Sequence, residues 1–384
     1  MGARRIMLHI GTEKTGTSTL QMLAAVNRKL LLANGVCYPL LPGDTSHVGL
    51  AIYAADPNRG NSLHAILGLR TRAAVAEFRD NFLERLGQEI DASGCDTILL
   101  SNEHLSSRAS RPEHVLRIVQ GLRTIAEEIR VFIYLRPQYE LIVSGYSQAV
   151  KSGRTEPIDT GLSVTNHYFN YDRMLSYWES AVGIESITVR RFLKQQFVGG
   201  SLINDFFATL GIVLPPDIVI PPNRNISLDA ETVEFLRCAN CIAARRGKDG
   251  HIEGRRRLIG ALEDLSKGPR ITVPAEELAA IDEAFAAGNR RVNERYFPGS
   301  TAPLFPAFAG EGAGEIFTLT AERAVEIGIA LWRESSSAAA RKRAIGAAPG
   351  DWRRPIRGYG RSRHKATRAV ENEAFGEDDD SAVN

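Results

Sequence analysis

The chain has 384 residues, with 47 Lys and Arg against 45 Asp and Glu, 43% hydrophobic residues and 24% charged residues. This composition is typical of a soluble globular protein, and it excludes fibrous, collagen-like and wholly disordered chains. No apolar stretch approaches the roughly 18 residues of a membrane helix, and the start, MGARRIMLHIGTEKTG, does not resemble a signal peptide. We therefore expect a cytoplasmic protein without a transmembrane segment.

Short apolar runs alternate with helical patterns along the first 210 residues. The predicted strands are 6–10, 97–101, 131–135 and 187–190, and the predicted helices are 18–34, 73–91, 112–128, 138–151 and 201–210. Strands that alternate with helices favour right-handed crossovers and a parallel sheet covered on both faces. The pattern predicts an α/β fold with three layers, in which ligands bind beyond the carboxyl ends of the strands.

The rest of the chain divides into a helical part and a charged tail. After a proline-rich segment at 214–229, helical patterns continue to about residue 334, and we assign 1–334 to one domain with a helical C-terminal extension. Residues 335–384 are rich in Gly and Arg and end in a run of acids, so we expect them to be mostly disordered. The tail's basic part suits weak contact with an acidic surface, whereas the body is too balanced in charge for nucleic acid.

Four cysteines are too few for a disulfide framework in a chain of this length. Cys238 and Cys241 form a single CxxC on a predicted helix, where this spacing serves burial as well as chemistry. Because no second CxxC or pair of histidines accompanies them, we expect no metal site.

The segment HIGTEKTGTSTLQ at 9–21 has the pattern of an anion-binding loop. Gly11 and Gly16 allow main-chain N–H groups to approach an anion, the helix that follows adds partial positive charge, and Lys14 adds a full charge. The lysine precedes the second glycine, so the segment does not match the nucleoside-triphosphatase loop G-x-x-x-x-G-K-[ST].

A second anion-binding pattern follows a later strand. In YLRPQYELIVSGYSQ, Arg136 stands at the strand end and Ser144 lies eight residues later, about two helical turns away. None of the predicted strands ends in the aspartate with which triphosphatases help to hold magnesium. The two patterns therefore predict a site for two phosphates without a metal.

Together, LHIGTEKTGTSTLQ and YLRPQYELIVSGYSQ resemble the sulfotransferase family that uses 3'-phosphoadenosine 5'-phosphosulfate, and most closely its bacterial members of the carbohydrate type. The resemblance covers about residues 6–334 and implies a P-loop-like fold. It implies 3'-phosphoadenosine 5'-phosphosulfate as co-substrate and a carbohydrate or other hydroxyl-bearing acceptor. The donor-binding residues that it implies are Lys14, Thr15, Gly16, Thr17 and Ser18 for the 5'-phosphosulfate, and Arg136, Ser144 and Arg224 for the 3'-phosphate.

Transfer to a hydroxyl requires a general base near the carboxyl edge of the sheet. Glu103, two residues beyond the strand TILLS, is the first candidate, and its alternative role is to pair with an arginine or cap the next helix. His47 is a second catalytic candidate that could line the acceptor pocket. His104 ranks lower, because in an extended segment it points away from Glu103.

The residues thus favour a sulfotransferase in which Lys14 stabilises the leaving oxygen and Glu103 accepts the proton. Two alternatives stay open, a nucleotide-dependent kinase and a non-catalytic nucleotide-binding protein. A magnesium requirement with ATP would support the first, and donor binding without turnover would support the second.

Overall fold

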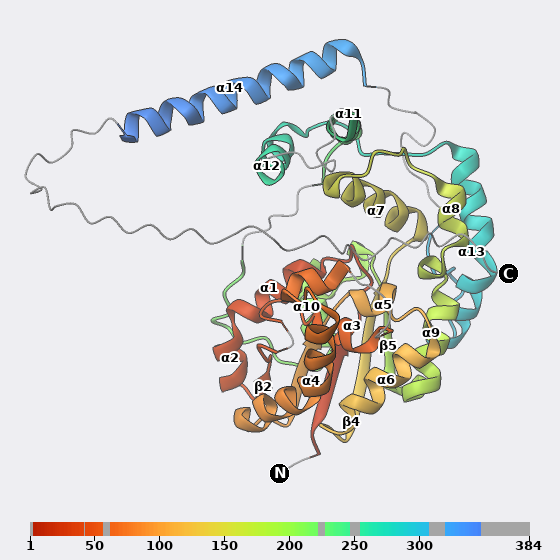
Figure 1. Cartoon of the computed structure of the whole chain (residues 1–384). Helices are drawn as coiled ribbons and strands as arrows, with labels where there is room; N and C mark the ends of the chain where they lie inside the picture. Colours follow the sequence, from red (N-terminus) through yellow and green to blue (C-terminus); the bar gives the residue numbers. More distant parts are fainter. Residues whose placement is uncertain are drawn as a thin grey trace, which may run out of the picture. The chain divides into compact units, whose positions relative to one another are not determined.

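Five parallel strands form one sheet in the order β2-β3-β1-β4-β5 (Figure 1). The structure is a computed structural model that describes residues 3–41, 43–56, 62–221, 227–245, 254–306 and 319–346. The strands are β1 (Arg5–His9), β2 (Val36–Cys37), β3 (Thr97–Ser101), β4 (Glu128–Leu135) and β5 (Ile187–Arg191). His9 and Ser101 pair at the ends of β1 and β3, so these carboxyl ends lie side by side.

Helices cover both faces of this sheet. Side chains alternate along β1, so Met7 joins the core on one face while Ile6 and Leu8 join the core on the other. The first face is covered by α1 (Thr17–Val26), α2 (Arg28–Ala33) and α10 (Leu202–Thr209). The second face is covered by α3 (Gly49–Ala54), α4 (Arg72–Ser93), α5 (His104–Arg108), α6 (Pro112–Leu122) and α9 (Tyr171–Val182). The predicted α/β fold, with three layers around a parallel sheet, is confirmed.

A second group of helices gathers around α7 (Gln138–Ser152), which follows β4 (Figure 1). The other members of this group are α8 (Thr160–Thr165), α11 (Ala230–Arg245), α12 (Arg255–Leu265) and α13 (Ala275–Tyr296). Tyr139 and Ile142 of α7 share a small core with Leu278 and Phe285 of α13. On α11, the buried amide of Asn240 donates to two main-chain oxygens at the C-terminal end of α7. These contacts form the helical extension that the sequence predicts.

Several boundaries differ from those expected from the sequence. The helix predicted at 18–34 is two helices that meet at Asn27, and the helix predicted at 112–128 ends at Leu122, because β4 begins at Glu128. Five elements were not predicted from the sequence, namely β2, α3, α5, α8 and α9. Five short 3₁₀ segments complete the described elements, namely Ser62–Leu67, His167–Phe169, Ile184–Ser186, Lys194–Gln196 and Val198–Gly200.

The last helix, α14 (Ala321–Gly346), continues beyond the boundary at residue 334 that the sequence analysis set. The chain divides into two compact units, Met1–Ile327 and Gly328–Asn384, and the division falls within this helix. The rest of the tail lies outside the described residues, so its disorder stays a prediction. Within the described part of the chain, no helix combines the length and the hydropathy needed to cross a membrane.

Candidate functional site

The loop between β1 and α1 turns sharply and presents the first turn of α1. Gly11 and Gly16 have φ values of 110° and 76°, which glycine adopts without a steric penalty, and Lys14 has a φ of 63°. Gly16 directly precedes α1, and no side chain from the described residues caps this helix end. Since the first N–H groups of a helix lack partners within it and carry partial positive charge, this end is suited to an anion.

The hydroxyl residues of the loop do not all face outward. The Thr15 hydroxyl donates to the Thr12 carbonyl over 2.6 Å, and Thr15 is fully buried. Thr17 is also buried, whereas Ser18 is exposed. Thr15 and Thr17 would therefore meet an anion through their main-chain N–H groups, and Ser18 alone of the three offers an exposed side chain.

Lys14 lies among other cations. Its ammonium donates to Gln148 Oε1 of α7 over 3.1 Å. Burial lowers the pKa of the Lys14 ammonium, and the positive charges of Lys151 and Arg136 lower it further, although nearby carboxylates oppose this. An anion bound among these three cations would relieve their mutual repulsion.

Arg136, the first residue after β4, joins the two predicted motifs. Its Nη1 donates to the Lys14 carbonyl over 2.9 Å, and its Nε donates to Glu140 Oε2 over 2.9 Å. The guanidinium carbon lies 5.9 Å from the centre of the Phe192 ring. Arg136 is thus held against the loop before any ligand binds. Arg224, the third predicted contact to a 3'-phosphate, lies outside the described residues.

One face of α7 carries the polar residues that border this loop. Glu140, Ser144 and Gln148 follow one another at intervals of four residues and therefore lie on the same side of the helix. Glu140 binds Arg136 at one end of this row, and Gln148 binds Lys14 at the other. Ser144, which is half-buried, stands between them. The structure thus brings Lys14, Arg136 and Ser144 to one place.

Glu103 lies beside the loop, just before α5. A Cβ placed on Gly11 would be 3.1 Å from the Glu103 Cα, from its carbonyl oxygen and from Ser106 Oγ, so only a glycine fits here without displacement. Gln21 of α1 donates from Nε2 to Glu103 Oε2 over 2.5 Å. The Glu103 side chain does not cap α5, and among the described residues no partner is found for its second carboxylate oxygen.

His104 belongs to a second polar group at the same edge of the sheet. Its Nδ1 lies 3.1 Å from Glu13 Oε1, which also accepts a hydrogen bond from the Ser107 hydroxyl. Burial opposes the charged imidazole, but the hydrogen bond that His104 donates to Glu13 and the charges of the nearby carboxylates prevail and raise the pKa of His104. The expectation of an extended segment here is wrong, because Glu103 has helical backbone angles and α5 begins at His104.

His47 supports the fold beneath this edge. It is fully buried, its Nδ1 accepts from the Ser101 N–H over 3.0 Å, and its Nε2 lies 2.9 Å from the Pro39 carbonyl. Burial lowers the pKa of His47 to about 3, so the imidazole is neutral at ordinary pH. With both ring nitrogens bound to the main chain, His47 does not line an acceptor pocket as the sequence analysis expected.

Two polar residues of the site were missed in the sequence analysis. Gln21 is buried on the apolar face of α1, beside Leu20 and Leu23, and touches Glu103. Glu13, within the loop, binds His104 and Ser107, and its own N–H donates to the Tyr168 hydroxyl over 3.0 Å. The only sequence signal for Gln21 was an amide at a position where helical periodicity calls for an apolar residue.

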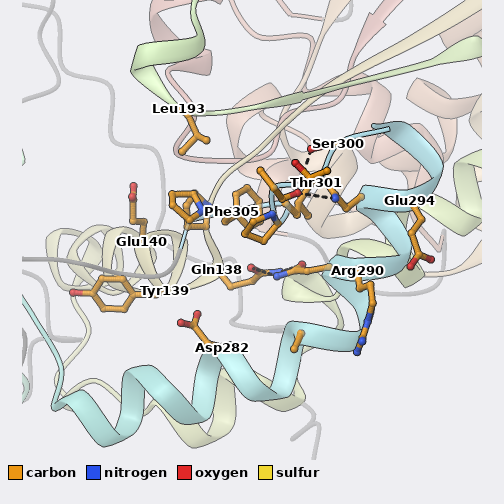
Figure 2. Close-up of a pocket in the computed structure, with 18 residues that line it drawn as sticks. Gln138, Tyr139, Glu140, Leu193, Asp282, Arg290, Glu294, Ser300, Thr301 and Phe305 are labelled. Carbon is orange, nitrogen blue, oxygen red and sulfur yellow. Dashed lines mark hydrogen bonds between the residues drawn. The ribbon is translucent and has the colours of Figure 1, made fainter. Parts of the chain in front are cut away.

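A cavity of about 940 Å³ lies between the first turn of α7, one face of α13 and the segment 300–306 (Figure 2). Asp282, Arg290 and Glu294 line it along α13, as Figure 2 shows. Two further lining residues, Gln138 and Asn289, are hydrogen-bonded to each other: each side-chain amide donates to the oxygen of the other, over 2.7 and 3.1 Å. Glu140 also lines the cavity, so the partner of Arg136 is shared between the two regions.

The CxxC pair on α11 is half-buried and both thiols are free. Cys241 Sγ lies 3.4 Å from the Thr155 carbonyl, and Cys238 Sγ lies 3.6 Å from Glu234 Oε1. In the ranges that the structure describes, no group of three or more His, Cys, Asp or Glu side chains is placed to hold a metal ion.

No protein-family model matches the chain. An uncharacterized protein of Archaeoglobus fulgidus is 36% identical over 111 residues, which are 29% of this chain and 30% of the length of that relative. Among solved structures, the chain is similar to a sulfotransferase from Alicyclobacillus acidocaldarius, with 12% identity, a TM-score of 0.37, and coverage of 77% of this chain and 96% of that one. It is also similar to the sulfotransferase domain from the curacin biosynthetic pathway, with 12% identity, a TM-score of 0.34, and coverage of 59% and 79%. Such TM-scores do not establish a shared fold.

Proposed function

We propose that the protein is a sulfotransferase that moves a sulfuryl group from 3'-phosphoadenosine 5'-phosphosulfate to a hydroxyl of a carbohydrate-like acceptor. The observation that carries this proposal is the hydrogen bond from Arg136 to the Lys14 carbonyl, which joins two anion-binding motifs from distant parts of the sequence. Lys151 adds a third cation nearby. Two adjacent anion sites suit a donor with phosphate groups at both its 5' and 3' positions.

The donor would lie between the loop and α7. The N–H groups at the start of α1, together with Lys14 and Ser18, would hold the 5'-phosphosulfate, and Arg136 and Ser144 would hold the 3'-phosphate. The open start of α1 and the excess of positive charge at Lys14 fit such an anion. Arg224 remains a proposed third contact to the 3'-phosphate.

In the proposed reaction, the acceptor hydroxyl oxygen attacks sulfur while the bond from sulfur to the 5'-phosphate oxygen breaks. Glu103 takes the hydroxyl proton on the carboxylate oxygen that Gln21 does not hold. Lys14 offsets the negative charge that grows on the departing phosphate oxygen. The products are a sulfated acceptor and adenosine 3',5'-bisphosphate, so atoms and charge are balanced without a metal.

His104 is the second candidate base, because Glu13 binds its Nδ1. When neutral, this imidazole would donate from Nδ1 to Glu13 and keep Nε2 as the proton acceptor. We rank Glu103 first because its main chain lies against Gly11 at the start of the loop, and because one of its carboxylate oxygens has no partner among the described residues.

The first test is nucleotide binding in the absence of magnesium. Calorimetry should show much tighter binding of adenosine 3',5'-bisphosphate than of adenosine 5'-phosphate, and Arg136→Ala should weaken the bisphosphate at least tenfold, since a charge-assisted bond contributes about 1.5–3 kcal/mol. Arg130→Ala is the matched control, because Arg130 is an exposed arginine of β4, the strand that Arg136 follows. Equal affinity for the two nucleotides would overturn the choice of donor.

The second test is turnover. Transfer of labelled sulfate to a panel of glycans, followed by mass analysis of the products, should yield a sulfated sugar. Phosphate transfer from ATP that requires magnesium would instead establish the kinase, and tight donor binding without any transfer would establish a non-catalytic nucleotide-binding protein.

A further inference from the structure

We infer that Gln21 is a positioning residue for Glu103, acting through a buried hydrogen-bond chain that ends at His9. The inference rests on the proposed function, in which Glu103 is the base. Gln21 is 3% exposed, and its Nε2 donates to Glu103 Oε2 over 2.5 Å and to Ser101 Oγ over 3.3 Å. Ser101 Oγ in turn lies 2.8 Å from His9 Nδ1.

Ser101, the last residue of β3, is the centre of this chain. Its N–H donates to His47 Nδ1, and its hydroxyl lies between Gln21 and His9. All four of these residues are buried, so none of them can exchange its partner for bulk water at low cost.

His9 ends this chain in apolar surroundings. Burial lowers the pKa of His9 to about 3, so its imidazole is neutral, and the rings of Phe132 and Phe206 lie against it. The Ser101 hydroxyl accepts from Gln21 with one lone pair, and it bonds to His9 Nδ1 with its hydrogen or with its second lone pair according to the tautomer of His9. His9 Nε2 has no hydrogen-bond partner among the described residues.

The two contacts of Gln21 fix the orientation of its amide. Its two N–H bonds point to Ser101 Oγ and Glu103 Oε2, and a flipped amide would bring its oxygen against an ionised carboxylate. The carboxylate is therefore held by one oxygen, while the other remains available to accept the proton of a substrate. Gln21 sets the direction of the base without touching the reacting atoms.

The experiment compares Gln21→Met, which keeps length and removes both donors, with Glu103→Gln and the double variant. We expect Gln21→Met to lower kcat about tenfold and to leave the Kd of adenosine 3',5'-bisphosphate within twofold. In the Glu103→Gln background, the same change should have no further effect on kcat, because the group that Gln21 orients is already gone. A full tenfold loss in the double variant would overturn the inference.

Gln138→Met is the matched control for the general effect of losing a buried glutamine. Gln138 is 5% exposed and binds Asn289 outside the donor site, so its loss should lower Tm and leave kcat unchanged. If Gln21→Met does not fold, Gln21→Asn serves instead, since its shorter amide is withdrawn from Glu103. An Asn variant with unchanged kcat would also overturn the inference.

A readout without turnover separates this inference from the proposed function. In the wild-type protein, the side-chain N–H resonance of Gln21 should lie downfield, as expected for a short bond to a carboxylate, and Glu103→Gln should move it upfield. If this shift occurs but no sulfuryl transfer is found with any acceptor, the proposed function fails and the pairing stands. If transfer is normal and Glu103→Gln leaves the resonance in place, the role of Gln21 fails alone.

Discussion

The proton acceptor is the residue on which the proposed chemistry depends most directly. Glu103→Gln keeps the size of the side chain but cannot accept a proton near neutral pH, so kcat should fall by about 10²–10⁴-fold. Affinity for adenosine 3',5'-bisphosphate should barely change, because Glu103 does not contact the nucleotide in the proposed arrangement. Steady-state kinetics together with calorimetry measure both quantities.

His104→Gln provides the contrast for that measurement. If Glu103→Gln kept near-normal turnover while His104→Gln lost it, the imidazole held by Glu13 would be the base. Unfolding of Glu103→Gln would instead identify the carboxylate as a structural partner of Gln21.

Glu140 would compete with the proposed donor for Arg136. Its carboxylate occupies the guanidinium Nε, and a 3'-phosphate bound there would face a second negative charge. Glu140→Gln should therefore tighten binding of adenosine 3',5'-bisphosphate several-fold and leave adenosine 5'-phosphate unchanged, as measured by calorimetry. Glu234→Gln is the control, because Glu234 lies on a different helix, α11, where it is ion-paired with Arg237. This variant should leave both affinities unchanged. Weaker binding of the bisphosphate would mean that Glu140 orients Arg136 for the donor.

At the scale of single elements, apolar periodicity predicted the central strands and α7, because each is a continuous run whose burial is visible locally. β2 was missed because two residues carry no periodic signal. The break between α1 and α2 was also missed. The break depends on Asn27, whose side-chain amide donates to the Val219 carbonyl and accepts from the Val219 N–H. These two residues are 192 positions apart in the sequence.

The candidate site likewise combines residues that a local sequence pattern reveals with residues that only contacts between distant segments reveal. Lys14, Arg136 and Ser144 belong to short motifs whose spacing is readable in the sequence, and the structure places them together. Gln21 and Glu13 act on Glu103 and His104, which are more than 80 residues away, and no local pattern reports such pairs. His47 was misjudged because sequence position near a strand end does not reveal burial.

The junction of α1 and α2 can be tested directly. Asn27 is buried, and its side chain makes three hydrogen bonds, to the Leu23 carbonyl and to both main-chain groups of Val219. Asn27→Ala should lower the free energy of unfolding by about 1–3 kcal/mol, since it strands buried main-chain groups. Asn34→Ala, which removes one exposed bond to Leu30, should cost no more than about 0.5 kcal/mol. Equal losses in urea titrations would contradict the role of the junction.

At the scale of the whole molecule, buried neutral histidines make stability depend on pH. In the folded protein the pKa values of His9 and His47 are about 3, whereas in the unfolded chain they are near 6.5. The unfolded state therefore binds more protons between these values, and stability falls as pH drops below 6.5. In this range, each of these two histidines lowers the free energy of unfolding by about 1.4 kcal/mol for every unit that the pH falls. The raised pKa of His104 acts in the opposite direction, because the folded state then binds a proton more readily than the unfolded chain.

Urea unfolding at pH 7, 6 and 5 measures this slope. His47→Gln removes one titrating group, so the variant should start less stable at pH 7 and lose less stability on acidification. A stability that stays constant from pH 7 to pH 5 in the wild-type protein would show that the two imidazoles can be protonated without unfolding.

The absence of a side chain at Gly11 has a mechanical consequence. With the main chain of Glu103 only 3.1 Å from where a Cβ would stand, the loop that carries Lys14 and the segment that carries the candidate base are in direct backbone contact. A single methyl group there would have to displace the Glu103 main chain or the Ser106 hydroxyl, and it would also be strained by the positive φ of this position. The separation of these two segments is thus fixed by contact between main chains, which a change of side-chain rotamer cannot alter.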